Sequence, residues 1–193
     1  MEEVIKGNMV LVEAIARCCP EEPGFVRHPL DQDGNQQHWF VITNPPLLAQ
    51  AAQALKAAGA RLCMISGYNR KDRPDYDKWP FGAAYHFELE GVVYNVKVRL
   101  SAEQPEPPTI TPWFFNADWH EREMQELVGI MVKDQPNPTR LFLKPDVDPE
   151  LVRHMCRSCR QIKDAEAHVE ILEAIPRKAP KQDAAAPEAE AKA

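Results

Sequence analysis

The chain has 193 residues, 44% of them hydrophobic, and its formal net charge is −6 at neutral pH. This length suffices for one domain with appendages and a real hydrophobic core. The acidic balance argues against a general nucleic-acid-binding protein, which would need a cationic surface to neutralise phosphates.

The N-terminal part of the chain predicts two helices separated by strands. Pro20 ends the first apolar helical stretch, because proline cannot continue a helix. Asn44-Pro45 supplies a cap and a proline at the first helical position, and Gly59 closes this second helix. The expected elements are a helix over 9–16, a short strand over 24–30, a strand over 39–43 and a helix over 47–58.

The following part predicts a strand over 61–66, a polar loop over 67–80 and a hairpin. The hairpin joins residues 83–89 to residues 92–100 through Glu90-Gly91. Its second arm alternates apolar residues, expected to point inward, with polar residues, expected to point outward. The inward set is Tyr94, Val96, Val98 and Leu100, and the outward set is Asn95, Lys97 and Arg99.

Four parts of the chain follow from these patterns. Residues 1–104 form an α+β domain, in which helices flank a largely antiparallel sheet. Prolines then break the chain into a connector, which leads to a helix and docking segment within 105–145. Residues 146–175 form an extended, proline-rich C-terminal arm, in which Asp148-Pro149 starts a short helix. Residues 176–193 contain mainly alanine, proline and charged residues, which predicts a disordered tail.

The most specific stretch of the sequence runs from Trp119 to Ile130. Asn116 or Asp118 is placed to cap a helix N-terminus, and Gly129 to end the helix. The stretch therefore predicts one short, strongly capped helix.

The acidic residues of this helix have two interpretations. The helix dipole, together with a pair between Arg122 and Glu126 four residues apart, explains Glu121, Glu123 and Glu126. Alternatively, the three carboxylates bind a hard cation or relay protons. We favour the structural explanation, because the first turns of helices are often acidic.

The stretch resembles the signature of the thirty-kilodalton (C) subunit family of respiratory complex I. Two departures stand out. Asp134-Gln135 occupies the place of the family's usual Gly-His, so no role of that histidine carries over, and Val128 replaces the more common phenylalanine. The matching residues are Glu121, Arg122, Glu123, Glu126, Gly129, Ile130, Pro136, Arg140 and Leu141.

The resemblance implies a hydrophilic, non-catalytic subunit without a cofactor. Such a subunit would dock on the large catalytic subunit of a complex-I-like oxidoreductase and position it for electron transfer coupled to ion translocation. The expected interface residues are Trp119, Glu121, Arg122, Glu123, Glu126, Gly129, Pro136, Pro138, Arg140 and Leu141.

Within this class, the short chain and the run Pro136-Asn137-Pro138-Thr139-Arg140-Leu141-Phe142-Leu143 look like the counterpart subunit of membrane-bound, energy-converting nickel-iron hydrogenases. That branch implies a hydrogenase-like large subunit, a small iron-sulfur subunit and membrane subunits as partners. The nickel-iron centre and the iron-sulfur clusters would lie in these partners. The alternative branch is the C subunit of an NADH or quinone dehydrogenase.

The start of the chain, its apolar runs and its cysteines together predict the cellular compartment. The acidic Met1-Glu2-Glu3 start and the lack of a long apolar run predict neither a secretory signal nor a membrane span. Five cysteines, an odd number, favour reduced thiols over a disulfide framework. With the resemblance, these features predict a cytoplasmic chain that is peripheral to the membrane through its partners.

A small metal or redox protein is the rival hypothesis from another class. Cys156 and Cys159 have the spacing of a zinc or iron-sulfur ligand pair, and His154 lies beside them. Two further ligands would have to come from elsewhere, for example His168 or Cys63. Because structural zinc sites usually show a second cysteine pair, we favour inert thiols on a helix. A third possibility is a plain adaptor outside any enzyme complex.

Overall fold

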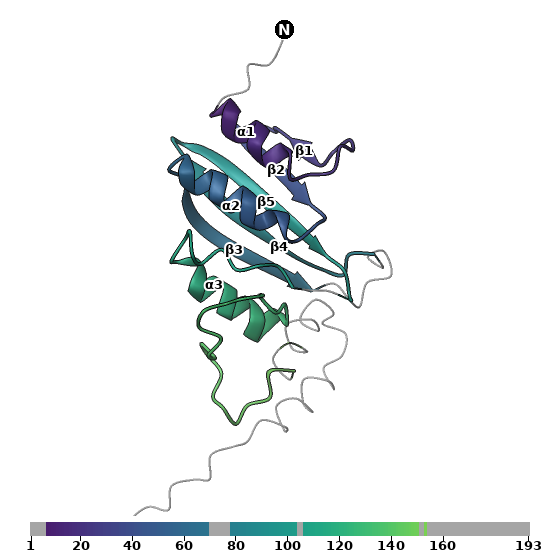
Figure 1. Ribbon diagram of the computed structural model, residues 1–193, viewed down its shortest axis with the longest axis vertical. Helices are drawn as coiled ribbons and strands as arrows, with labels where there is room; N and C mark the ends of the chain where they lie inside the picture. The colour runs from purple at the N-terminus through teal and green to yellow at the C-terminus, as the bar shows by residue number, and fades with distance from the viewer. Residues whose placement is uncertain (1–6, 70–77, 104–105, 151–152, 154–193) are drawn as a thin grey trace, which may run out of the picture.

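The computed structural model describes residues 7–69, 78–103, 106–150 and 153. Its strands are β1 (Val26–Arg27), β2 (Gln37–Ile42), β3 (Arg61–Asn69), β4 (Phe81–Leu89) and β5 (Val92–Leu100). They form one five-stranded sheet in the order β1-β2-β5-β4-β3 (Figure 1). β2 and β5 run parallel, and every other neighbouring pair is antiparallel. The predicted α+β fold with a largely antiparallel sheet is confirmed.

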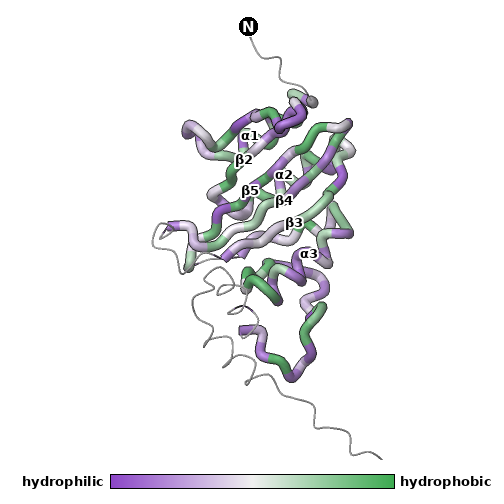
Figure 2. Tube along the Cα trace, turned by 180° about the vertical axis from the view of Figure 1, so that it is seen from behind, coloured by the Kyte–Doolittle hydropathy of each residue, from purple (hydrophilic) through white to green (hydrophobic). Residues whose placement is uncertain are grey.

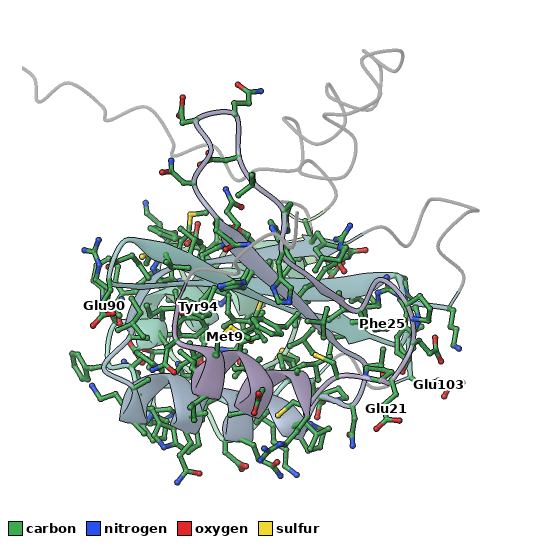
Figure 3. All side chains as sticks on the ribbon, turned by 90° about the horizontal axis from the view of Figure 1, so that it is seen from above. Met9, Glu21, Phe25, Glu90, Tyr94 and Glu103 are labelled. Carbon is green, nitrogen blue, oxygen red and sulfur yellow. The ribbon has the colours of Figure 1, made fainter. Side chains whose placement is uncertain are left out.

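Two helices, α1 (Met9–Ala16) and α2 (Leu47–Ala57), lie on the same side of this sheet (Figures 1 and 3). The Asn8 side chain caps α1 by accepting a hydrogen bond from the Leu11 amide at 3.1 Å. The Asn8 amide donates to the Tyr94 hydroxyl at 3.0 Å, which fixes the start of α1 to β5. Both predicted helices are confirmed, whereas the predicted strand over 24–30 shrinks to the two residues of β1.

The hydrophobic core lies between the sheet and these two helices. Its fully buried side chains include Ile15 of α1, Leu55 of α2, Phe40 of β2 and Tyr94 of β5. Full burial of an apolar side chain of this size stabilises a fold by about 1.5–3 kcal/mol. The core therefore joins elements that are far apart in the sequence.

The predicted hairpin between β4 and β5 is confirmed. Glu90 and Gly91 both have positive φ, 52° and 79°, as the tight turns preferred by hairpins require. The predicted alternation holds, and Asn95 points away from the core residues Tyr94 and Val96, but it is buried all the same. Its amide donates to the His38 carbonyl oxygen at 3.3 Å, and its Oδ1 lies 2.6 Å from Nδ1 of His86. That face of the sheet is covered at this point, so Asn95 does not reach water.

β3 extends three residues beyond its predicted end, up to Asn69, where a loop was expected. These three residues pair with β4, with Gly67 opposite Ala83 and Asn69 opposite Phe81. Gly67 also sets how closely the next segment packs. A Cβ atom there would lie 2.7 Å from Cγ of Met124, so only glycine lets the segment that carries Met124 approach the strand so closely. Residues 70–77 of the expected polar loop lie outside the described residues.

A second layer follows the edge strand β3. It consists of α3 (Ala117–Glu123) and the π-helix η2 (Met124–Val128), which directly continues α3 (Figure 1). Two amide side chains fasten this helical unit to β3. Asn116 donates to the Leu62 carbonyl at 2.9 Å, and Asn69 donates to the Val128 carbonyl at 3.3 Å. The helical unit therefore runs along the strand from end to end.

Hydrophobic stretches are also visible in the segment that carries α3 and in the chain after it (Figure 2). Over the described ranges, no helix is both long and apolar enough to cross a membrane. The proposed helix after Asp148-Pro149 is described only at its start, where the Asp148 side chain accepts the Glu150 amide at 3.0 Å.

Candidate docking site

The signature helix begins and ends where the sequence predicts, but its second half differs. It starts at Ala117, and Gly129 ends it in the left-handed conformation at φ 82°. Between them, the turn over residues 124–128 is a π-helix, closed by a 3.1 Å bond from the Gly129 amide to the Met124 carbonyl. Asn116 occupies the cap position without a capping bond, because its side chain binds β3 instead. π-turns often mark functional sites.

The predicted pair between Arg122 and Glu126 is wrong. Arg122 forms an ion pair with Asp118, one turn earlier, at 3.2 Å. The same guanidinium donates to the carbonyl oxygens of Thr139 and Arg140 at 2.9 and 3.1 Å. Arg122 therefore joins the signature helix to the chain that returns past it. It does not pair with Glu126, because that carboxylate binds backbone amides of residues 141–143.

Glu126 binds three successive backbone amides of the returning chain. The amides of Leu141, Phe142 and Leu143 donate to its carboxylate at 3.1, 2.8 and 2.6 Å. Burial raises the pKa of Glu126, but the three amides and the nearby Arg140 outweigh this effect and hold the pKa below the usual value. The group thus acts as a fixed anion that shapes residues 141–143.

Glu121 is fully buried and forms the centre of a second polar cluster. Its carboxylate accepts hydrogen bonds from the Thr109 hydroxyl at 2.6 Å, the Ile110 amide at 2.7 Å and the Thr111 hydroxyl at 3.0 Å. Burial raises its pKa; these three bonds lower it in part, and Asp118 raises it further. The helix-dipole explanation of Glu121 is therefore wrong, because the residue binds the connector before the helix.

Gln135 completes this cluster at the position where the sequence departs from the family signature. Its amide nitrogen lies 3.3 Å from carboxylate oxygens of both Asp118 and Glu121. Its amide oxygen accepts the Asn137 amide at 2.6 Å. A neutral amide thus supplies both a donor and an acceptor at this place.

Two further arginines fix the chain after the helix. Arg140 donates to the carbonyls of Lys144 and Val147, each at 2.7 Å. Arg153 donates to the carbonyls of Gln125 and Glu126 in the π-helix, at 2.5 and 3.1 Å. The sequence offered no local signal for Arg153, because these partners precede it by more than twenty residues.

A signal for the role of Glu126 did exist. Pro138 and Pro145 flank the aliphatic run Leu141-Phe142-Leu143 and disfavour long regular structure there, so amides of this run need acceptors outside a helix or sheet. A carboxylate in the preceding signature was a suitable acceptor for them.

The ten expected interface residues separate into two groups. Internal contacts engage Glu121, Arg122, Glu126 and Arg140, and Gly129 packs against the Arg153 side chain. The exposed group is Trp119, Glu123, Pro136 and Pro138, with Leu141 partly exposed. Trp119 is 63% exposed and Phe142 57%, although both are large and hydrophobic. We call the surface formed by α3, η2 and residues 130–147 the docking face.

The rival metal hypothesis rests on residues outside the described ranges, namely His154, Cys156, Cys159 and His168. Cys63 is exposed on β3, and within the described part of the chain no three or more histidine, cysteine or acidic side chains form a group suited to a metal ion.

Comparison with known proteins agrees with the geometry. The C subunit of F420H2 dehydrogenase from Methanosarcina mazei is 34% identical over 88 residues, which are 45% of this chain and 52% of that protein. The C/D subunit of NADH-quinone oxidoreductase from Shewanella woodyi is 44% identical over 88 residues, 42% of this chain and 14% of that protein. This chain therefore spans about half the length of the first relative and a small part of the second.

A solved structure shares the fold. One chain of the membrane-bound sulfane sulfur reductase, an archaeal respiratory membrane complex, superposes with a TM-score of 0.56 at 13% identity, covering 92% of this chain and 98% of that one. The family described as the 30 Kd subunit of respiratory-chain NADH dehydrogenase matches residues 41–158. Because this match covers more than half of the chain, the chain belongs to that family.

Proposed function

We propose that this chain is a cofactor-free structural subunit of a complex-I-like, membrane-associated oxidoreductase. It docks on the large catalytic subunit through the docking face and holds that subunit in position for electron transfer coupled to ion translocation. One observation carries the proposal: residues 130–147 lack regular structure, yet several polar side chains hold them in one shape that exposes large hydrophobic groups.

The energetics favour a partner on this face. Ordering an irregular residue costs about 1–2 kcal/mol of backbone entropy. Here the Glu126 and Arg140 contacts offset that cost, while Phe142 and Trp119 remain open to water. A free-standing protein gains little from such an arrangement. A subunit gains a preformed binding surface, because rigid partners lose less entropy on association.

The relatives support the identity of the partner. The name of the Shewanella relative joins the letters C and D, so in that protein the matched region and a second subunit share one name. We infer that the same second subunit, the large catalytic one, is the neighbour of this chain. Small iron-sulfur and membrane subunits complete the assembly, which places this chain on the cytoplasmic side, peripheral to the membrane.

Two branches of the function are distinguished by the metal of the partner. The Pro136-Asn137-Pro138 run favours the energy-converting nickel-iron hydrogenase branch, with nickel-iron and iron-sulfur centres in the partner subunits. The names of the relatives favour the second candidate, the C subunit of a dehydrogenase acting with quinone or F420.

The test is affinity purification from native membranes in mild detergent through a tag on this chain. Co-purifying proteins are identified by mass spectrometry, and nickel is quantified. A large subunit with nickel supports the hydrogenase branch, and the same subunit without nickel supports the dehydrogenase branch. Isolation of this chain alone, with stoichiometric zinc or iron, would refute both and favour the cysteine hypothesis.

A charge-reversal pair connects this experiment to the docking face. Arg122→Glu places a carboxylate beside Asp118 and the carbonyls of Thr139 and Arg140, so we expect loss of the large subunit from the purified complex. Arg27→Glu is the matched control, because Arg27 is exposed on β1 at the opposite edge of the sheet. Equal recovery of the large subunit with both variants would contradict the proposed docking face.

A further inference from the structure

A groove runs between the edge strand β3 and the signature helix. One wall consists of four consecutive β3 residues, Met64 to Gly67, and the cavity between the walls measures about 430 Å³. The other wall is one face of the continuous helical unit, whose residues follow the spacing of three and four. These helical residues are His120, Glu123, Met124, Leu127 and Val128.

The groove is held open by contacts at both ends. Asn116 binds the Leu62 carbonyl beside the start of the helical unit, and Asn69 binds the Val128 carbonyl at its end. Within the groove, Gly67 lets Met124 approach β3, so the two walls pack closely at that point. The two walls therefore have fixed positions before any ligand arrives, which favours binding.

The lining is mainly apolar, with two titratable side chains at its edge. Met64 is 47% exposed, and Leu127 and Val128 are partly exposed, so water covers apolar surface here. Glu123 is exposed and forms no ion pair or hydrogen bond with any described residue. Neither wall contributes a lysine or an arginine. A complementary ligand is therefore apolar and carries a positive charge opposite Glu123.

We propose that this groove binds an apolar segment of the large catalytic subunit that places a lysine or arginine against Glu123. The proposal rests on the proposed function and names the chemistry of its contact. Its position supports the large subunit as the occupant, because the exposed Trp119 of the docking face lies one helical turn before Glu123, so the two side chains are neighbours on α3. Groove and exposed aromatic thus form one continuous surface.

A second copy of this chain fits the groove poorly. In a two-fold symmetric contact the same patch faces itself, so two Glu123 carboxylates would enter one interface without a cation from either wall. Such like-charge contacts weaken association. The residues of this chain after Arg153 are the remaining alternative, which the experiment distinguishes.

A photo-reactive amino acid at Met64 tests the occupant in the intact complex. After irradiation, the crosslinked peptide is identified by mass spectrometry. We expect a large-subunit peptide with apolar residues and a lysine or arginine. A crosslink to this chain, either to its own residues after 153 or to a second copy, overturns the proposal. A second chain carries the photo-reactive amino acid at Phe142 instead. If that chain crosslinks to the large subunit and the chain labelled at Met64 crosslinks to nothing, the proposal is also overturned.

A charge variant tests the predicted cation. Glu123→Lys leaves the fold intact, because the side chain is exposed and unpaired, but it opposes the partner's positive charge. We expect about a tenfold or greater loss of the large subunit after a salt wash. Glu13→Lys is the matched control, since Glu13 is exposed on α1 and far from the groove in sequence and position.

The outcomes separate this proposal from the proposed function. If the wild-type chain retains the large subunit but Glu123→Lys and Glu13→Lys behave alike, the groove is not its contact, and the docking function stands. If the wild-type chain never retains a large subunit, both fail. Recovery of binding when the partner's crosslinked basic residue is changed to glutamate, in the Glu123→Lys background, would establish the charge pair.

Discussion

The sheet with its two helices and the docking face keep their shapes by different means. In the sheet, apolar side chains such as Phe40, Leu55 and Tyr94 are fully buried between strands and helices. In the docking face, Glu126, Arg122 and Arg140 bind backbone groups of the returning chain. Both regions bury apolar side chains, among them Met124, Ile130 and Val132 of the docking face. The docking face adds directed polar contacts that fix its irregular chain.

The two regions should therefore differ in which amino-acid substitutions they tolerate. Apolar burial is non-directional, so a sheet core accepts other hydrophobic residues of similar volume. A carboxylate that binds three amides has no substitute of equal charge and geometry. The signature residues therefore make the directed polar contacts of the docking face, whereas the sheet core requires only hydrophobic residues of suitable volume.

Removal of a core side chain should have the largest effect. Phe40→Ala deletes a fully buried ring in β2, and we expect the free energy of unfolding to fall by about 3–5 kcal/mol. The loss should reach both regions, because the docking face packs on β3 of the same sheet. Guanidinium unfolding, followed by circular dichroism and by tryptophan fluorescence, measures it. A loss below about 1 kcal/mol would show that the core does not support the molecule.

Loss of the Glu126 carboxylate should affect only the docking face. Glu126→Ala leaves the amides of residues 141–143 without an acceptor, and we expect a local cost of about 2–3 kcal/mol. Hydrogen exchange should accelerate at these amides while β4 and β5 remain protected. Glu123→Ala, at an exposed and unpaired side chain, is the control and should change exchange little. Equal acceleration in the sheet would contradict the separation of the two regions.

Local signals in the sequence predicted much of the sheet region. The helix over 9–16, the turn at Glu90-Gly91 and the end of the signature helix at Gly129 all follow from residues next to one another. The exceptions depend on distant neighbours. β3 continues past Ser66 because its last residues pair with β4, and Asn95 is buried because His86 and His38 meet it across the sheet.

The docking face was located by the signature, but its contacts were not predicted. Arg122 binds Asp118 and the carbonyls of Thr139 and Arg140, although pairing with Glu126 was expected. Helical spacing specifies which side chains can meet on one helix, but it carries no information about a chain that returns past that helix. Contacts across such separations become predictable only when the path of the chain is known.

The two buried carboxylates should respond to pH in opposite directions. The pKa of Glu126 lies below that of an unfolded glutamate, so its contribution is present at neutral pH and is lost as the pH falls through that lowered pKa. The pKa of Glu121 is raised, chiefly by burial, so the fold favours its protonated form, and its contribution decreases as the pH rises through the raised pKa.

Nuclear magnetic resonance can separate these two titrations. The Phe142 and Leu143 amides should shift with a midpoint below the usual glutamate range, and the Ile110 amide with a midpoint above it. Glu126→Gln should remove the first transition and Glu121→Gln the second. Coincident midpoints in the wild-type chain would contradict the distinct environments of the two carboxylates.

The smallest change in the free energy of unfolding is expected for a substitution at Tyr85. The Tyr85 hydroxyl is buried and has no hydrogen-bond partner among the described residues, and the charge of Glu121 adds to burial in raising its pKa. Tyr85→Phe removes only this unpaired group, so the free energy of unfolding should change by less than about 0.5 kcal/mol or rise slightly. Urea unfolding measures the change. A loss above about 1 kcal/mol would contradict this, because it would mean that the Tyr85 hydroxyl makes a stabilising polar contact.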